Sequence, residues 1–196
     1  MTFNSLEYIV LLVTVYLLFW GLPWGGRMLL LLAASVIFYA WWNVPYVGLV
    51  VVSAGIDYLA GLGMRRFDAR KRVRVLLLIS SLSANLAILG YFKYANFFID
   101  TFAAASGHPD SASHLAILLP PGISFYTFQS MSYTIDVYRR AIQPTRSPLK
   151  FFLFVMFFPQ LVAGPIERAG HLISQFEHVL SNRFSAENLL SGTRLI

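Results

Sequence analysis

Four long stretches of the sequence contain no charged residue, and this feature limits the fold more than any other. Asp, Glu, Lys and Arg are missing from 8–26, 28–56, 75–92 and 111–135. Only 12% of the 196 residues are charged, whereas a soluble domain carries roughly 25%. Because so little polar material is available to cover a water-facing surface, a soluble enzyme, a disordered chain and a nucleic-acid-binding module are excluded. We therefore expect an integral membrane protein.

The uncharged runs predict an all-α fold, a polytopic bundle of transmembrane helices that forms a single domain over 1–196. A span needs about 20 apolar residues to cross roughly 30 Å of hydrocarbon. Five spans are expected, at about 6–22, 28–42, 45–63, 73–99 and 115–138. Asn43-Val44-Pro45 separates the second span from the third, because proline disfavours helix at the residue before it.

The distribution of Lys and Arg predicts an orientation. Six basic residues and a single acidic one, Asp68, lie within 65–74, and such a block is typical of a cytoplasmic loop that faces anionic lipid. Counting spans from this loop puts the N-terminus and 100–114 outside, and the basic residues of 139–150 inside. Every basic cluster then falls on one side of the bilayer.

The pattern changes after Lys150. The apolar run that follows is short and contains Pro159 and Gly164-Pro165, so a re-entrant element is expected at 151–165, surrounded by protein or by a water-filled cavity. An amphipathic helix is expected at 171–183, lying in the cytoplasmic interface. Ser185 is expected to cap another helix that starts near Ala186. Because the chain stops inside that element, we expect it to be part of a longer protein.

The fifth expected span carries one polar stripe. At 100° per residue, five side chains fall within an arc of about 80°. They are Tyr126, Gln129, Tyr133, Asp136 and Arg140. Such a stripe predicts the wall of a polar passage, and the alternative is hydrogen bonding between packed helices, which needs no substrate.

Other polar residues of the spans have simpler interpretations. Asp57, Ser81 and Asn85 are expected to hydrogen-bond to neighbouring helices. Asp136 and Arg139 are spaced for an ion pair at a helix end.

The residues alone name no chemistry. The four histidines, at 108, 114, 171 and 178, are expected at the surface and lack the spacing of metal ligands, and the chain has no cysteine. No Ser-His-Asp set, phosphate loop or paired-carboxylate site is recognisable.

Several segments, in order along the chain, resemble the membrane-bound O-acyltransferase family, and within it the bacterial alginate O-acetylases and D-alanyl transferases. The two most specific are 119–139, which begins LPPGISFYTFQ, and 158–168, FPQLVAGPIER. Weaker matches are 3–5 (FNS), 37–42 (IFYAWW) and 90–98 (GYFKYANFF).

The resemblance implies a helical bundle around a funnel in a bacterial inner membrane. There an acyl group, expected to be acetyl, passes to hydroxyls of an exported polysaccharide such as alginate. It implies acetyl-CoA or another acyl carrier as donor, no bound cofactor or metal, and periplasmic acetylation proteins as partners. The family's catalytic histidine lies in a later Trp-His-Gly segment that this chain lacks, so no catalytic residue is assigned here and the chain alone is expected to be inactive.

Two sets of residues follow as expected site residues. The funnel-lining or substrate-binding set is Tyr126, Gln129, Tyr133, Asp136 and Gln160. The set expected to shape the backbone is Pro120, Pro121, Gly122, Pro159, Gly164 and Pro165. A transporter or channel subunit would use the same polar stripe and broken element, and it remains an alternative, as does a non-catalytic scaffold.

Overall fold

The computed structural model describes residues 5–106, 115, 118–161, 164 and 167–181. All regular structure in this part is helical, which confirms the expected all-α class. The helices are α1 (Leu6–Gly21), α2 (Trp24–Ala40), α3 (Val44–Arg66), α4 (Lys71–Ala105), α5 (Ile123–Tyr138), α6 (Pro148–Met156), α7 (Phe158–Leu161) and α8 (Ala169–Ser181).

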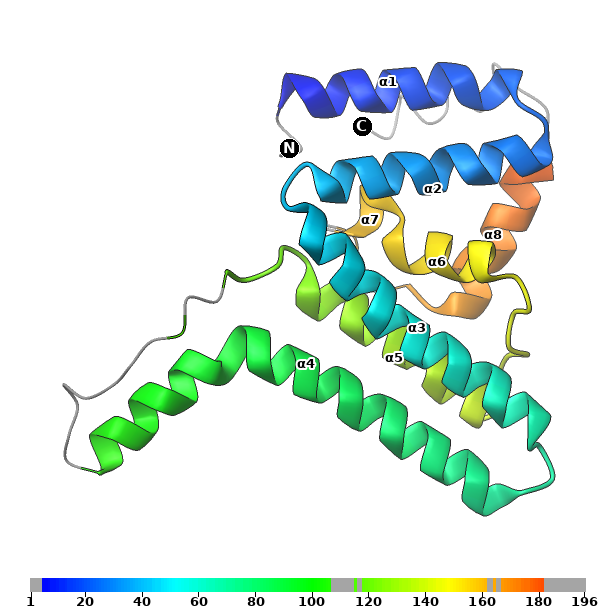
Figure 1. Cartoon of the computed structure of the whole chain (residues 1–196). Helices are drawn as coiled ribbons and strands as arrows, with labels where there is room; N and C mark the ends of the chain where they lie inside the picture. The colour runs from blue at the N-terminus through cyan, green and yellow to red at the C-terminus, as the bar shows by residue number, and fades with distance from the viewer. Residues whose placement is uncertain (1–4, 107–114, 116–117, 162–163, 165–166, 182–196) are drawn as a thin grey trace.

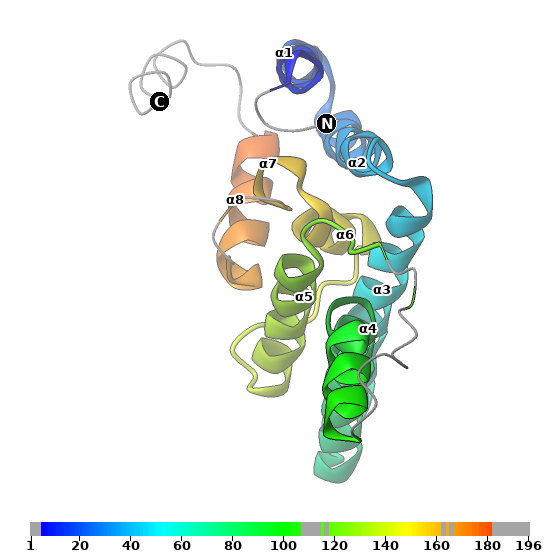
Figure 2. The ribbon, with the colours of Figure 1, turned by 90° about the vertical axis from the view of Figure 1, so that its left-hand side faces the viewer.

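The long helices form two groups, and short helices pack against both. Figure 1 shows α1 and α2 lying side by side across one end of the molecule, while α3, α4 and α5 run together at an angle to them. The short helices α6 and α7 lie between the two groups in Figure 1, and the view turned by 90° shows α8 to one side of α6, away from α3 (Figure 2). Helix α6 is central to this packing, because it contacts α2, α3, α5, α7 and α8.

Short capping and breaking signals set the helix limits. Ser5 caps α1, and its hydroxyl accepts a hydrogen bond from the backbone N–H of Tyr8 at 3.3 Å. Pro23 separates α1 from α2, and Asn43 precedes α3, which has a proline in its first turn. Ser147 caps α6 in the same way as Ser5 caps α1. A break between the second and third expected spans is confirmed, but it lies at 41–43, because Val44 and Pro45 form the first turn of α3.

Two helices, α3 and α4, are long and apolar enough to cross a membrane. They correspond to the third and fourth expected spans. Helices α1 and α2 are apolar but have 16 and 17 residues, fewer than the roughly 20 that a perpendicular span needs.

The fifth expected span is shorter in the structure than in the sequence pattern. Helix α5 begins at Ile123 and has 16 residues, whereas the uncharged run predicted a helix from about 115. The correction has a local cause. Consecutive prolines disfavour helix before them, and Gly122, at φ 71°, is in the left-handed region and marks the start of α5.

Helix α4 is longer than the span predicted at 73–99. Its 35 residues extend over about 52 Å at 1.5 Å per residue. Figure 1 shows two straight arms joined by a sharp bend. The C-terminal part is rich in exposed aromatic side chains, including Tyr91, Tyr94, Phe97, Phe98 and Phe102.

The short run after Lys150 is broken, as its sequence predicts. Helix α6 ends at Met156, Phe157 leaves the helical conformation (φ −53°, ψ 108°), and the four-residue helix α7 contains Pro159. Helix α6 is surrounded by protein, because Phe151 and the run Leu153–Met156 are buried. Whether 151–165 enters and leaves the membrane on the same side stays a prediction.

Helix α8 covers most of the segment expected as an interfacial helix, and 182–183 lie outside the described residues. Leu172, Phe176 and Leu180 are buried at a spacing of four residues, while His171 and Glu177 are exposed. The buried side chains pack into the bundle core, so most of the apolar face contacts protein. Its position in the membrane interface stays a prediction, and the helix expected near Ala186 lies outside the described residues.

One buried carboxylate joins α3, α4 and α5. Asp57 is fully buried in the middle of α3. Its Oδ1 accepts hydrogen bonds from Ser81 and from Thr134 Oγ1 (2.7 Å), and its Oδ2 accepts one from Asn85 Nδ2 (3.0 Å). Ser53 donates to Asn85 Oδ1 at 2.5 Å. The expectation that Asp57, Ser81 and Asn85 bond between helices is confirmed.

This network sets the rotation of two helices against a third. An unsatisfied polar group in an apolar environment costs several kcal/mol, so α4 and α5 must present Ser81, Asn85 and Thr134 toward α3. A turn of either helix about its axis would remove a donor from the Asp57 carboxylate.

We predict that Ser81→Ala destabilises the full-length protein and that Ser80→Ala does not. Ser81 donates to Asp57 from a buried position. The neighbouring Ser80 is exposed, and its partner among the described residues is the Leu77 carbonyl of its own helix. The expected loss is about 1 kcal/mol of unfolding free energy for Ser81→Ala and less than about 0.5 kcal/mol for Ser80→Ala.

The measurement is reversible unfolding in mixed micelles at increasing denaturing detergent. Equal midpoints for the two alanine variants would show that the Asp57 network does not hold the three helices.

Candidate functional site

The two segments with the most specific sequence patterns, 119–139 and 158–168, meet in the structure. A Cβ atom added at Gly122 would lie 2.7 Å from the carbonyl oxygen of Leu161 in α7. The Tyr39 hydroxyl donates a hydrogen bond to the Pro121 carbonyl at 2.8 Å, which ties the same turn to α2. Glycine is required at 122 by both its positive φ and this close approach. We call the contact region of α5, α6 and α7 the junction.

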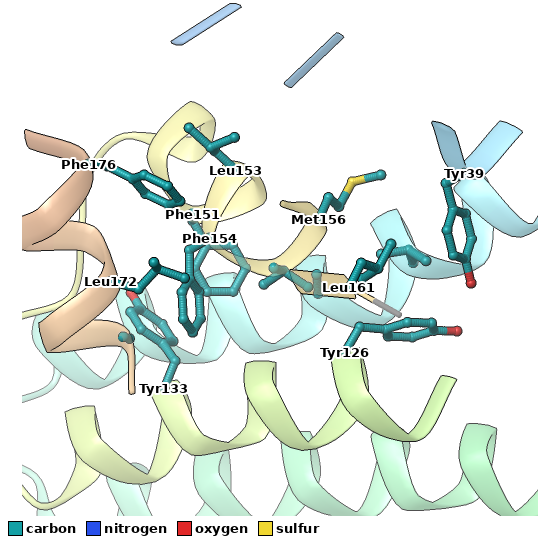
Figure 3. Close-up of a cluster of buried hydrophobic side chains, with 14 of the residues drawn as sticks. Tyr39, Tyr126, Tyr133, Phe151, Leu153, Phe154, Met156, Leu161, Leu172 and Phe176 are labelled. Atoms are coloured by element: carbon teal, nitrogen blue, oxygen red, sulfur yellow. The ribbon is translucent and has the colours of Figure 1, made fainter. Parts of the chain in front are cut away.

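The polar stripe of α5 faces this junction. Figure 3 shows Tyr126 and Tyr133 on α5 directed toward α6, α7 and Tyr39. Gln129 donates through Nε2 to the Phe154 carbonyl of α6 at 2.6 Å. The Tyr133 ring packs on Phe151 with centroids 4.7 Å apart.

Gln129 and Tyr133 have structural partners. Gln129 bonds α5 to α6, which is the interhelical hydrogen bonding that was the alternative to a polar passage. The Tyr133 hydroxyl accepts from the Thr145 N–H at 3.2 Å, and the ring lies so close to α3 that a Cβ atom on Gly61 would be 2.9 Å from it. Their role in lining a funnel stays a prediction.

Tyr126 differs from these two residues. It is fully buried, and its ring meets that of Tyr39 edge to face with centroids 6.4 Å apart. Among the described residues its hydroxyl makes no well-formed hydrogen bond, since its interaction with the Tyr39 hydroxyl falls short of one, and the hydroxyl of the adjacent Thr127 has no partner there either. Two buried hydroxyls without a well-formed hydrogen bond next to the Pro-Pro-Gly turn are unusual, because most buried polar atoms are satisfied.

The remaining expected site residues lie around the junction or beyond it. Asp136 is half-buried near the C-terminal end of α5, away from the turn. Gln160 is half-buried on α7, and its carbonyl accepts from the Gly164 N–H at 2.9 Å. A side chain at Gly164 would overlap Gln160. Pro120 is buried, Pro159 is half-buried in α7, and Pro165 lies outside the described residues.

Among the described residues, the polar side chains of α5 that face the junction are the phenols of Tyr126 and Tyr133, the Thr127 hydroxyl and the Gln129 amide. These groups can donate hydrogen bonds, and none of them is a general base near neutral pH. The exposed positions of His171 and His178 on α8 agree with the expectation of surface histidines. His108 and His114 lie outside the described residues.

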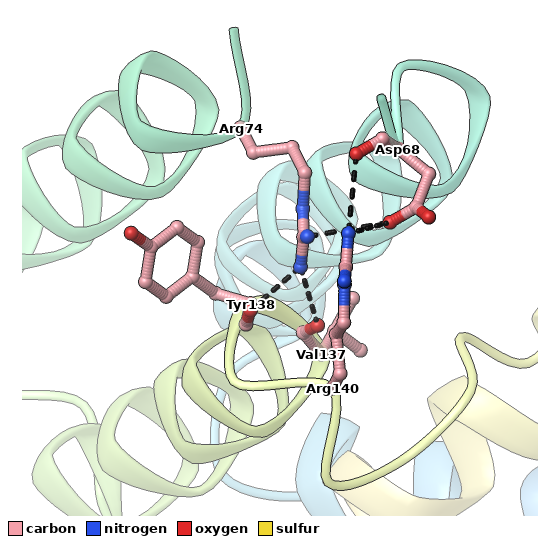
Figure 4. Close-up of polar contacts among 5 residues, drawn as sticks. All are labelled: Asp68, Arg74, Val137, Tyr138 and Arg140. Carbon is pink, nitrogen blue, oxygen red and sulfur yellow. Dashed lines mark hydrogen bonds and ion pairs between the residues drawn. The ribbon is translucent and has the colours of Figure 1, made fainter. Parts of the chain in front are cut away.

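A second polar cluster lies at the C-terminal end of α5 (Figure 4). The Arg74 guanidinium, which is largely buried, donates to the carbonyls of Val137 (3.3 Å) and Tyr138 (2.6 Å). Asp68 bridges Arg74 (3.3 Å) and Arg140 (3.1 Å) through one carboxylate oxygen. Arg74 thus satisfies carbonyls that the end of α5 leaves without helical partners.

The sequence pattern did not reveal this cluster. The expected Asp136–Arg139 ion pair is absent from the described residues, and Arg140 pairs with Asp68, 72 residues away, instead. The signal in the sequence was limited to the basic block itself, in which nothing distinguishes Arg74 from Arg72.

Comparison with known proteins links the chain to acetylating enzymes. It is 40% identical over 183 residues to a probable alginate O-acetylase AlgI of Azotobacter vinelandii, covering 91% of this chain and 36% of that protein. The corresponding protein of Pseudomonas aeruginosa is 41% identical, covering 91% and 35%. A peptidoglycan O-acetyltransferase of Helicobacter pylori is 34% identical over 186 residues, covering 83% and 35%.

The chain therefore spans about a third of the length of the curated relatives that it matches. No family model matches it, and no solved structure matches it.

We predict that Gly122→Ala in the full-length protein disrupts the junction. Alanine at φ 71° is strained, and its Cβ would lie 2.7 Å from the backbone carbonyl oxygen of Leu161, so the backbone would have to shift. The expected cost is at least about 2 kcal/mol of unfolding free energy. Thermal unfolding in detergent measures it.

Gly90→Ala is the matched control. Gly90 lies in α4 with nothing within 4 Å of an added Cβ, so alanine there is expected to leave stability unchanged or raise it slightly. A Gly122→Ala variant as stable as Gly90→Ala would contradict the close approach between the Pro-Pro-Gly turn and α7.

Proposed function

We propose that this chain, which is homologous to the N-terminal third of the AlgI alginate O-acetylases of the membrane-bound O-acyltransferase family, forms the N-terminal wall of an O-acyltransferase. The reaction is the transfer of an acetyl group to hydroxyls of an exported polysaccharide such as alginate. The observation that carries the proposal is the identity of about 40% over 91% of the chain. The alginate-type acceptor is favoured over peptidoglycan, whose enzyme matches less closely, at 34%.

We propose that the enzyme lies in the bacterial inner membrane with its N-terminus outside and the loop 65–74 in the cytoplasm. The two long apolar helices support membrane insertion. The orientation rests on the basic residues at 65–74 and 139–150. The acyl donor, acetyl-CoA or another acyl carrier, would then arrive from the cytoplasm, while the acceptor and its partner acetylation proteins lie in the periplasm.

In such a transfer the oxygen of an acceptor hydroxyl bonds to the acyl carbonyl carbon, and the bond from that carbon to the donor's sulfur breaks. The hydroxyl proton passes to a general base and then to the leaving thiolate. The base is assigned to no residue of this chain. The family resemblance implies a histidine in a Trp-His-Gly segment of the longer protein.

Within this chain, Tyr126 is the strongest candidate to touch the acyl group. Charge grows on the carbonyl oxygen during the transfer, and a buried donor that is already in place stabilises it. The Gln129 amide donates to the Phe154 carbonyl. The Tyr133 hydroxyl accepts from the Thr145 N–H, a contact that holds the phenol in place without using its proton. The Tyr126 hydroxyl has no such partner in the described part of the chain, so it is available as a hydrogen-bond donor.

Deletion of the gene from its bacterium tests the function. We expect the exported polysaccharide to be made at its usual level but to lose its ester-linked acetate, measured as alkali-released acetate by NMR. The full-length gene should restore the acetate. A transporter or channel subunit would give the opposite result, with less polymer exported and acetylation intact, and loss of acetate from peptidoglycan alone would change the acceptor.

Tyr126→Phe tests the proposed role of the hydroxyl. We expect acetate on the polymer to fall at least ten-fold, with thermal stability unchanged because no hydrogen bond is lost. Tyr91→Phe, at an exposed position on α4, is the matched control and should keep full activity. Acetylation within a factor of two of the parent in Tyr126→Phe would remove this residue from the site.

A further inference from the structure

The Asp68–Arg74–Arg140 cluster lines two pockets. The walls of these pockets carry more positive than negative charge. One pocket has a volume of about 300 Å³ and is lined by Arg65, Asp68, Arg74 and Arg140 among others. The other has a volume of about 360 Å³, shares the last three of these residues, and adds Lys71 and Arg139. Volumes in this range suit a small ligand or a headgroup.

The charges of the lining do not balance. Five cationic side chains line the two pockets, and Asp68 is the acidic residue among the lining residues. Arg74 and Arg140 share its carboxylate. Arg65, Lys71 and Arg139 make no ion pair or side-chain hydrogen bond with the described residues. The unopposed charge of the lining calls for an anion.

The cationic groups are held in place before any ligand arrives. Arg74 is fixed by two carbonyls and one carboxylate. Arg140 occupies the left-handed region at φ 61°, where glycine is usual, and donates to both the carbonyl and the carboxylate of Asp68. Two guanidinium groups fixed in this way lose little freedom when they bind an oxyanion.

The backbone adds to the same field. Helix α4 begins at Lys71 and has no acidic residue in its first turn and no side-chain cap, so the positive end of its dipole adds to the charge of the cationic side chains. The negative end of α5 lies nearby, but Arg74 covers its last carbonyls. The local potential is therefore positive.

We infer that these two pockets form a binding site for a phosphate group, which the guanidinium groups of Arg65 and Arg140 and the ammonium of Lys71 recognise. Guanidinium groups bind phosphate through paired, charge-assisted hydrogen bonds. Under the proposed orientation the site faces the cytoplasm at the membrane surface. The phosphate belongs either to the headgroup of an anionic lipid or to a soluble phosphate ester.

The test uses the full-length protein in phosphatidylcholine nanodiscs and compares two double variants that remove the same charge. Arg65→Gln with Lys71→Gln removes two of the three groups that are proposed to bind the phosphate. Arg66→Gln with Arg72→Gln removes two exposed arginines from the same region that line neither pocket. None of the four side chains has a partner in the described part of the chain, so both variants should fold.

Two probes distinguish the sources. Pyrophosphate, titrated by calorimetry, reports a soluble phosphate. Retention of added phosphatidylglycerol, measured by native mass spectrometry, reports a lipid. For the probe that binds, we expect the lining variant to weaken binding at least ten-fold and the control variant less than two-fold.

Either probe behaving in this way supports the site and names its source. If the parent protein binds neither pyrophosphate nor phosphatidylglycerol, the proposed site is wrong. An equal loss in the two double variants also overturns it, because it would mean general attraction to a basic surface. Both readouts are independent of acetyl transfer, so they stand whatever the outcome for the proposed enzyme.

Discussion

The requirement that buried polar groups find partners, which is strongest at the carboxylate of Asp57, fixes how α3, α4 and α5 pack together. In an apolar environment Asp57 cannot leave its oxygens unpaired, and its donors come from two other helices. With α5 fixed against α3 and α4, its other face presents Tyr126, Gln129 and Tyr133 to α6. The junction and the arginine cluster both lie along α5, so the bonds to Asp57 that set the rotation of α5 also orient these two regions.

The sequence predicted what depends on local chemistry. The charge-free runs predicted the apolar helices, including the two long ones, α3 and α4. Pro45 predicted a break between α2 and α3. The start of α5 was placed too early because the length of the uncharged run outweighed Pro120, Pro121 and Gly122, although those residues are a strong local stop signal. The position of Asp57 predicted a hydrogen bond, since a carboxylate within a span needs a partner.

Contacts between distant residues could not be predicted in the same way. Thr134 donates to a carboxylate 77 residues away, and nothing in its neighbourhood marks it as different from other threonines. Arg74 bonds to carbonyls more than 60 residues away but sits among basic residues that look equivalent in the sequence. The polar stripe of α5 was visible, yet the engagement of Gln129 by a backbone carbonyl of α6 depends on where a second helix packs.

Arg140 shows how the two ends of α5 differ in kind. At the N-terminal end the chain uses Gly122 where φ is positive, and the backbone of α7 fills the space that a side chain would need. At the C-terminal end the chain meets the same conformational demand with an arginine, which costs about 1 kcal/mol relative to glycine. The Arg140 N–H bonds to the Val137 carbonyl and the Ala141 N–H to the Asp136 carbonyl, a helix ending that glycine would make at less cost. The local conformation therefore gives no reason for an arginine at this position. Arginine differs from glycine here by its side chain, which bonds to Asp68 and lines the two positively charged pockets. The N-terminal end of α5 is therefore suited to close packing, and the C-terminal end presents charge.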